Sequence, residues 1–166
     1  TIIQLQQSKI HKQVLENSQN FTISANILNV IDLYGWGFKL VWNALLLDAA
    51  DVRECLFLKS GGETFFTYKM NNTVGFVVID CSLLYNDIPG VNGSGTSATI
   101  QFYIKESGDC DLDVYDALLI DSSVQPIAHT VIEDALTQFL GAEKHFETAL
   151  RTAIDFNVIE MSGAIL

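Results

Sequence analysis

Apolar and polar residues alternate along much of the first two-thirds of this chain. Because successive side chains of a β-strand point to opposite faces, alternation of this kind predicts half-buried strands. The pattern recurs in four segments, through Phe21, Ile23, Ala25 and Ile27; Phe38, Leu40 and Trp42; Ile100, Phe102 and Ile104; and Leu112 and Val114. We therefore predict a β-rich core over residues 21–121. The pair of glycines around Trp36 is interpreted as a bend between the first two segments or a close backbone approach.

The stretch from Cys55 to Leu84 is rich in Phe, Val, Ile, Thr and Tyr. It divides into three runs, CLFLKS, ETFFTYKM and TVGFVVIDC, separated by the pairs at residues 61–62 (Gly-Gly) and 71–72 (Asn-Asn). Both pairs tolerate the positive φ that two-residue hairpin turns require, which predicts a three-stranded meander. Phe65 and Phe66 are adjacent, so one of them must point away from the core face.

The two ends of the chain show a different spacing. Ile3, Ile10 and Val14 fall near one face of a helix, which predicts an N-terminal helical arm over residues 1–18. After Pro126 the period becomes helical, which predicts a helical pair over residues 126–156. The remaining residues, 157–166, form an apolar tail that we expect to dock on protein.

Together these elements predict an α+β fold. It would be a mainly antiparallel sheet of about seven strands with two C-terminal helices and an N-terminal helical arm. At 166 residues, the whole chain (1–166) has the size of a single domain.

Charge limits the classes of partner. The chain has 20 acidic and 9 basic residues, for a net charge of −11. Because a nucleic-acid backbone is bound by Lys and Arg, we expect no nucleic-acid partner. The acidic surface either meets a basic protein or serves solubility. No apolar run approaches the roughly 20 residues of a membrane helix, so we expect no membrane partner.

Three cysteines occur, without a C-x-x-C pair. This usage favours a reducing compartment such as the cytoplasm, or a virion, although one bridge with a thiol left over is an alternative. The residues after Thr1 show no signal peptide, and removal of an earlier leader is compatible with this start. Three N-x-[ST] sequons, at Asn20, Asn71 and Asn92, would matter only in a secreted eukaryotic protein.

Candidate chemistry is sparse. Asp109, Asp111 and Asp113 have the i, i+2, i+4 spacing that begins a calcium loop, but the sixth position is Val114 and the twelfth is Ile120. We interpret the three acids as a solvent-facing strand edge and keep a metal site as the alternative. No zinc-protease, nucleophile-elbow, P-loop or dinucleotide motif occurs, so we expect no cofactor.

These observations favour a non-enzymatic structural or assembly protein that self-associates, such as a small virion or tail-like component. The expected partners are further copies in a homo-oligomer or a larger protein assembly. One alternative is an acidic binding module, such as an immunity protein or an inhibitor of a basic toxin or nuclease. A second is a metal-dependent enzyme that uses residues 109–113. The predicted contact residues are Ile3, Ile10, Val14, Phe65, Val158, Ile159 and Leu166.

Overall fold

One 22-residue strand, β2 (Asn20–Val41), runs through both layers of a β-sandwich. The computed structural model describes residues 1–7, 20–85, 87–106, 108–133 and 137–139. β2 turns over at one end of the sandwich, where Asn29 and Asp32 have φ of 55° and 59°. Asn and Asp tolerate this left-handed conformation better than other side chains do, which places the turn here.

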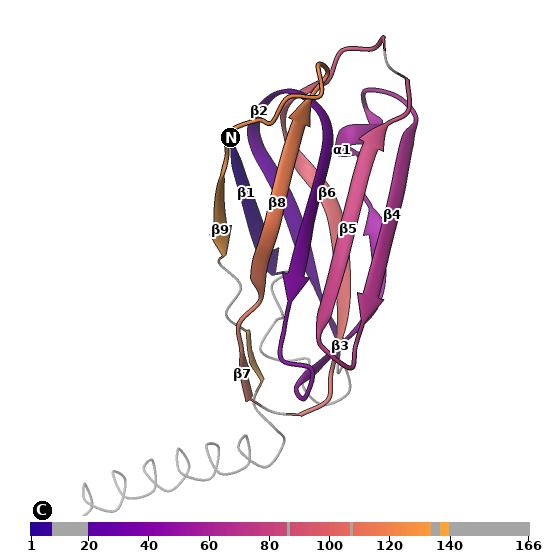
Figure 1. Ribbon diagram of the computed structural model, residues 1–166. Coiled ribbons are helices and arrows are strands. Elements are labelled where there is room, and N and C mark those ends of the chain that lie inside the picture. The colour runs from indigo at the N-terminus through magenta and orange to yellow at the C-terminus, as the bar shows by residue number, and fades with distance from the viewer. Residues whose placement is uncertain (8–19, 86, 107, 134–136, 140–166) are drawn as a thin grey trace, which may run out of the picture.

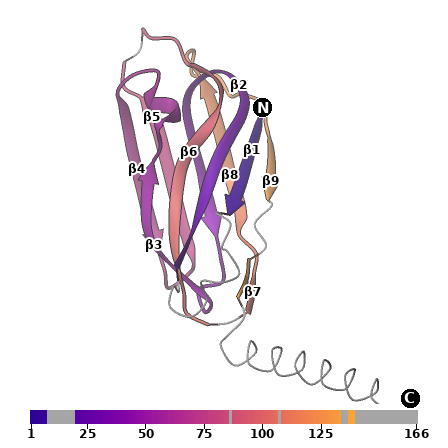
Figure 2. The ribbon, with the colours of Figure 1, turned by 180° about the vertical axis from the view of Figure 1, so that it is seen from behind.

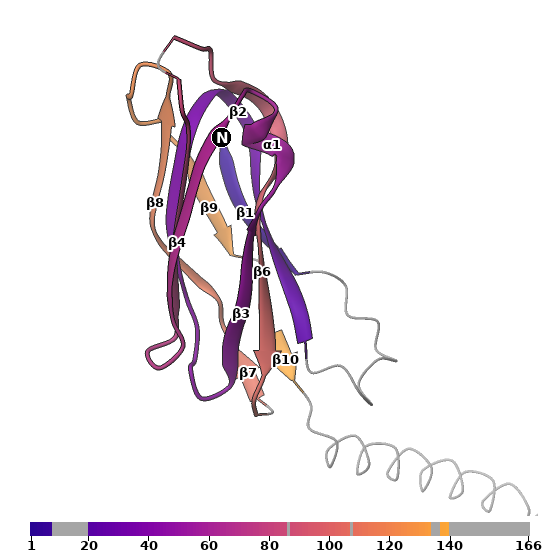
Figure 3. The ribbon, with the colours of Figure 1, turned by 90° about the vertical axis from the view of Figure 1, so that its right-hand side faces the viewer.

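The two layers share β2 and are seen edge-on in Figure 3. The first half of β2 pairs with β1 (Ile2–Gln7) and β6 (Val91–Ile104), giving the order β3-β6-β2-β1-β9. The second half pairs with β5 (Phe76–Leu83) and β8 (Asp113–Asp121), giving the order β4-β5-β2-β8. The other elements are β3 (Leu47–Glu54), α1 (Leu56–Lys59), β4 (Thr64–Asn71), β7 (Gly108–Cys110), β9 (Thr130–Glu133) and β10 (Thr137–Phe139).

Aromatic side chains fill the space between the layers. Phe102 on β6 is fully buried, and its ring stacks on Phe21 at 5.4 Å between centroids. Trp42 meets the same ring edge-on at 5.1 Å, and its Nε1 donates to the carbonyl oxygen of Leu47. The alternating apolar residues of the sequence are therefore the inward side of each strand, as the pattern predicted.

The predicted α+β class is wrong, because the described chain is nearly all strand. Residues 2–7 form β1, whose Ile3 and Leu5 alternate into the core, instead of part of a helical arm. Residues 130–133 and 137–139, expected in the helical pair, form strands β9 and β10. The alternation of Ile3 and Leu5 indicated a strand but was outweighed by the helical spacing of Ile3, Ile10 and Val14, while β9 and β10 are too short to show a period. Residues 8–18, 140–156 and the tail 157–166 lie outside the described residues.

The central meander is partly wrong. Its first run forms the short helix α1, and Gly61 and Gly62 lead the chain out of that helix instead of forming a hairpin turn. The second hairpin is present as β4 and β5, but its turn covers residues 72–75, where Gly75 has φ of 83°. Gly35 and Gly37 lie inside β2, so the bend between the first two segments is at residues 29–32.

Figure 2 shows the reverse side, where β3, β6 and the first half of β2 cover the second layer. Helix α1 closes one end of the sandwich, with Leu58 buried in the core and Phe57 against β6 at Gly95. Within the described part of the chain, no helix is long and apolar enough to span a membrane.

Candidate functional site

The outer face of the β4-β5-β2-β8 sheet carries a hollow of about 280 Å³. Four neighbouring strands contribute to it, so residues far apart in the sequence meet there. It is lined by Gly35, Trp36, Gly37, Phe65, Asp80, Cys81, Ser82, Asp116, Leu118 and Ile120.

Two glycines of β2 create the floor of the hollow. Along β2 the inward residues Trp36 and Phe38 are each only 4% exposed, and the alternate positions 35 and 37 face outward without side chains. In register, Gly37 lies opposite Asp80 on β5 and Leu118 on β8. The floor of the hollow is therefore backbone, and both glycines are buried because the side chains of Ile120 and Asp80 lie over them.

Apolar side chains stand at both sides of the floor. Phe65 on β4 is 58% exposed and Leu118 on β8 is 49% exposed. Phe66, the next residue, packs against the core, which confirms that the two adjacent phenylalanines point to opposite faces. Large apolar groups left in water around a concave backbone surface are typical of protein-binding sites.

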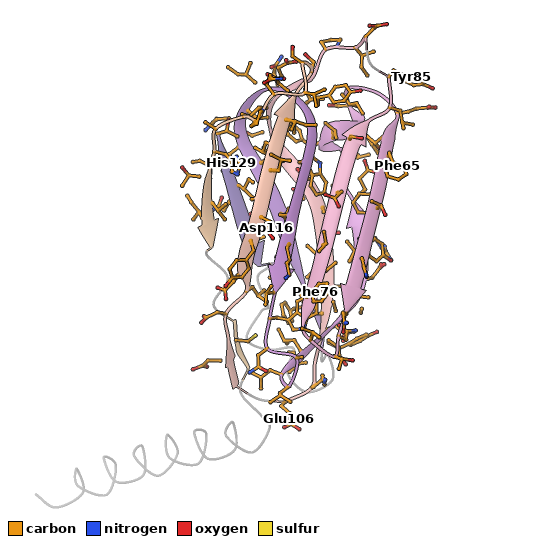
Figure 4. The ribbon with its side chains drawn as sticks, in the orientation of Figure 1. Phe65, Phe76, Tyr85, Glu106, Asp116 and His129 are labelled. Atoms are coloured by element: carbon orange, nitrogen blue, oxygen red, sulfur yellow. The ribbon has the colours of Figure 1, made fainter. Side chains whose placement is uncertain are left out.

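Two carboxylates add negative charge to the hollow. Asp80 extends over the floor from β5, and Asp116 has φ of 52° at a register shift between β2 and β8. A bulge of this kind re-aims a side chain, and Figure 4 draws Asp116 and Phe65 on the face toward the viewer. Among the described residues, neither carboxylate has a hydrogen-bond or ion-pair partner, which suits a basic group on a partner.

Cys81 lines the hollow but its thiol is directed to the other side of the sheet. Its Sγ lies 3.4 Å from Oε1 of Glu54, and the side chain is buried. Burial, followed by the negative charge of Glu54, raises the pKa of the Cys81 thiol far above its ordinary value. The thiol is therefore not an activated nucleophile.

The residues predicted to make protein contacts are distributed differently from the expectation. Phe65 lies on the hollow, while Ile3 is 2% exposed and belongs to the core of this chain. The other five predicted contacts, Ile10, Val14, Val158, Ile159 and Leu166, lie outside the described residues.

The three acids considered as a metal site occupy one end of the sandwich. Asp109 is exposed on β7, Asp111 is exposed in the connection, and Asp113 begins β8. In the ranges that the structure describes, no three His, Cys, Asp or Glu side chains gather closely enough to hold a metal ion.

Sequence reasoning missed most of the hollow. Gly35 and Gly37 were interpreted as a bend or a close backbone approach, although their alternation with Trp36 and Phe38 marks a strand with one face that lacks side chains. Nothing in the sequence pattern indicated that Asp80, Asp116 and Leu118 share a site, because their proximity depends on the order of strands in the sheet.

Comparison with known proteins identifies the fold. No family model matches the sequence, and no curated protein matches it. Among solved structures, the type II cohesin A11 of Bacteroides cellulosolvens superposes with a TM-score of 0.69 at 11% identity, covering 83% of this chain and 99% of that one. A non-cellulosomal cohesin of the archaeon Archaeoglobus fulgidus gives 0.60 at 13% identity, covering 78% and 87%.

A third structure is the sixth cohesin of Acetivibrio cellulolyticus scaffoldin B, solved in complex with a Cel5 dockerin variant. It gives a TM-score of 0.63 at 13% identity, covering 79% of this chain and 93% of that one. This chain therefore has a cohesin-like β-sandwich fold, and similarity at these identities shows the fold alone.

Proposed function

We propose that this chain is a non-enzymatic protein-binding module that assembles with a partner through the outer face of its β4-β5-β2-β8 sheet. One observation carries the proposal: exposed Phe65 and Leu118 flank a hollow of about 280 Å³ whose floor is the glycine backbone of β2. A monomer gains nothing from leaving these side chains in water, whereas a partner buries them.

The charge of the hollow specifies the chemistry of the partner. Asp80 and Asp116 present two carboxylates beside apolar side chains, and the chain as a whole carries −11. A complementary surface places a Lys or Arg near these carboxylates and apolar residues over Phe65 and Leu118. This chemistry also agrees with the acidic binding module considered from the sequence.

The fold suggests the class of partner. A cohesin of the same fold was solved bound to a dockerin, so a dockerin-like module is the first candidate for this chain. Self-association, expected from the sequence, concerns the free edge of β4 and not the floor of the hollow. Membership of a virion rests on composition alone and is not part of the proposal.

The test is a binding titration against purified dockerin modules from the organism that encodes this chain. Two variants are compared with the wild type. Leu118→Asp introduces a charge at the wall of the hollow. Tyr103→Asp introduces the same charge on the outer face of the other sheet, at a residue 47% exposed against 49% for Leu118. Circular dichroism melts confirm that both variants fold.

The proposal predicts that a dockerin binds the wild type and the Tyr103→Asp variant with similar affinity. Leu118→Asp should weaken that complex roughly 100-fold, because a buried apolar contact becomes an unpaired charge. If none of these dockerins binds, or if the two variants bind alike, the proposal is wrong.

A further inference from the structure

Strand β4 (Thr64–Asn71) is an open edge of the sandwich. It pairs on one side with β5, and no other described strand pairs with it. Figures 1 and 2 both place β4 at the lateral margin, with no described segment beyond it. An edge strand leaves a row of backbone N–H and C=O groups available to another chain.

The backbone groups at this edge can be assigned from one hydrogen bond. The N–H of Leu84 donates to the carbonyl oxygen of Glu63 at 3.0 Å, directly next to the paired Thr64 and Leu83. Hydrogen-bonded and non-bonded pairs alternate along an antiparallel ladder. Thr64, Phe66, Tyr68 and Met70 therefore direct their N–H and C=O groups away from β5 and toward the free edge.

The other edges of the two sheets are blocked, and β4 is not. β9 has only four residues, and β8 carries register shifts in its pairing with β2. β3 has a register shift at residues 49–51, where the Asn72 side chain bonds both the N–H and the carbonyl of Ala49 at 2.9 Å. β4 pairs with β5 over eight residues without a shift and contains neither Pro nor Gly.

Charge also separates β4 from the other edges. β3 contains Asp48, Asp51 and Glu54, β8 contains three aspartates, and β9 contains Glu133. β4 has no acid and carries a single Lys69. In a chain of net charge −11, β4 is the edge at which two copies can approach without opposed acids.

We propose that two copies of this chain associate edge to edge through β4, in an antiparallel pairing across a two-fold axis at Thr67. Residues paired directly across antiparallel strands share a face, so the register must join residues of equal parity. A centre at Thr67 places the rings of Phe66 and Tyr68 opposite each other. It also places Lys69 opposite Phe65 on the outer face.

This pairing closes at two copies. A β4-to-β4 contact uses the same patch on both subunits, and the remaining edges are short, shifted or acidic, so no third copy can add. The two-fold axis is perpendicular to the sheet, and both hollows lie on the same side of the combined sheet. The inference does not rest on the proposed function, because it is argued from the backbone edge of β4, although Phe65 borders both that edge and the hollow.

The experiment is light scattering of the full chain across a wide concentration series. Tyr68→Pro removes an N–H that points to the free edge and leaves the β4–β5 ladder intact, which an edge strand tolerates. Tyr68→Ser is the matched control, since it removes the same ring and keeps the N–H. We expect the wild type and Tyr68→Ser to become dimeric as concentration rises, and Tyr68→Pro to stay monomeric while it still melts cooperatively.

A disulfide test addresses the register. At the two-fold axis the Cα atoms of Thr67 and its symmetry mate are about 4.5 Å apart, within the range that a disulfide spans. Thr67→Cys should therefore form a covalent dimer under mild oxidation, and Thr73→Cys, exposed in the turn after β4, should not. Three results overturn the proposal: a wild type that stays monomeric, a Tyr68→Pro variant that dimerises, or a Tyr68→Ser variant that does not. Equal crosslinking of the two cysteine variants, or none in Thr67→Cys, refutes the register.

Discussion

The carboxylate of Asp80 lies over Gly37, in the space that a side chain at residue 37 would fill. A Cβ at Gly37 would collide with the Asp80 side chain, while the nearest backbone atom, the carbonyl oxygen of Ile79, is 3.3 Å away. Because the flexible carboxylate can move aside, Gly37→Ala should change the free energy of unfolding by less than about 1 kcal/mol. It should nevertheless weaken partner binding at least about tenfold, because the floor is filled and Asp80 is displaced.

The charge of Asp80 can be separated from its shape. Asp80→Asn keeps the volume and removes one negative charge from the hollow, and it should weaken binding of a basic partner. Asp109→Asn is the matched control, since it removes one charge from an exposed residue on β7. Titrations at two salt concentrations check the prediction, and an equal effect of both variants would show that only net charge matters.

The ion pair of Glu54 and Lys59 joins strand β3 to helix α1, and Glu54 also contacts β4 of the other layer. The Glu54 side chain is 8% exposed, and its Oε2 lies 2.9 Å from Nζ of Lys59. Its Oε1 accepts from Oγ1 of Thr64 at 2.6 Å. Lys59→Met should leave a buried carboxylate without its cation and lower the free energy of unfolding by about 2 kcal/mol. Adding Glu54→Gln should restore part of this loss in urea unfolding, and a fully additive double variant would contradict the coupling.

Asp32 makes the turn of β2 sensitive to pH. The hydroxyl of Ser122 donates to Oδ2 at 2.7 Å and the N–H of Gly90 donates to Oδ1 at 2.8 Å, and these bonds lower the pKa of Asp32. A carboxylate with a lowered pKa in the folded state stabilises the protein above its unfolded pKa of about 3.9. That contribution is lost as pH falls through the folded value.

Asp32→Asn removes this charge and keeps a residue that tolerates the local φ of 59°. The wild type should therefore be the more stable protein near neutral pH, and the difference should shrink as pH falls below about 4 and through the folded pKa of Asp32. Urea unfolding across pH measures the difference. A gap that persists at acidic pH would show that the carboxylate's charge is not its source.

Truncation of two adjacent residues of β6 should have very different effects on the free energy of unfolding. Phe102 is fully buried between Phe21 and Trp42, and Tyr103 is 47% exposed on the outer face. Phe102→Ala should lower the free energy of unfolding by about 3–5 kcal/mol, since it leaves a cavity in the aromatic core. Tyr103→Ala should change it by about 0.5 kcal/mol or less. Similar losses in chemical unfolding would place both residues at the core.

Local alternation was enough to find the strands that form the core. Most inward residues of 21–30, 98–105 and 112–120 are buried as the period of two predicted, and Ile104 and Val114 are partly buried. The helical elements predicted for the ends of the chain were wrong at every residue that the structure describes there. Ile3 was assigned to a helical stripe, but its partners are Ile27 on β2 and Val131 on β9, far away in sequence. The alternation of Ile3 and Leu5 was a local signal for this strand, but it is too short to settle the assignment without the pairing to β2 and β9.

Only part of the hollow could be predicted from the sequence. Phe65 was expected on the surface, because adjacent phenylalanines cannot both face one core. Asp80 and Leu118 become neighbours of Gly37 only after β5, β2 and β8 are placed side by side. The glycine pair at residues 35 and 37 indicated a close backbone approach, but it could not show which molecule approaches.

Hydrogen–deuterium exchange of the chain, alone and with the dockerin that binds it, tests the central claim most directly. We expect new protection in the peptides of β5 and β8, residues 76–83 and 113–121, because the partner covers the hollow between them. The peptides of β3 and the second half of β6, residues 47–54 and 98–104, face the opposite side and should exchange as before. Protection confined to β3 and β6 would contradict the account.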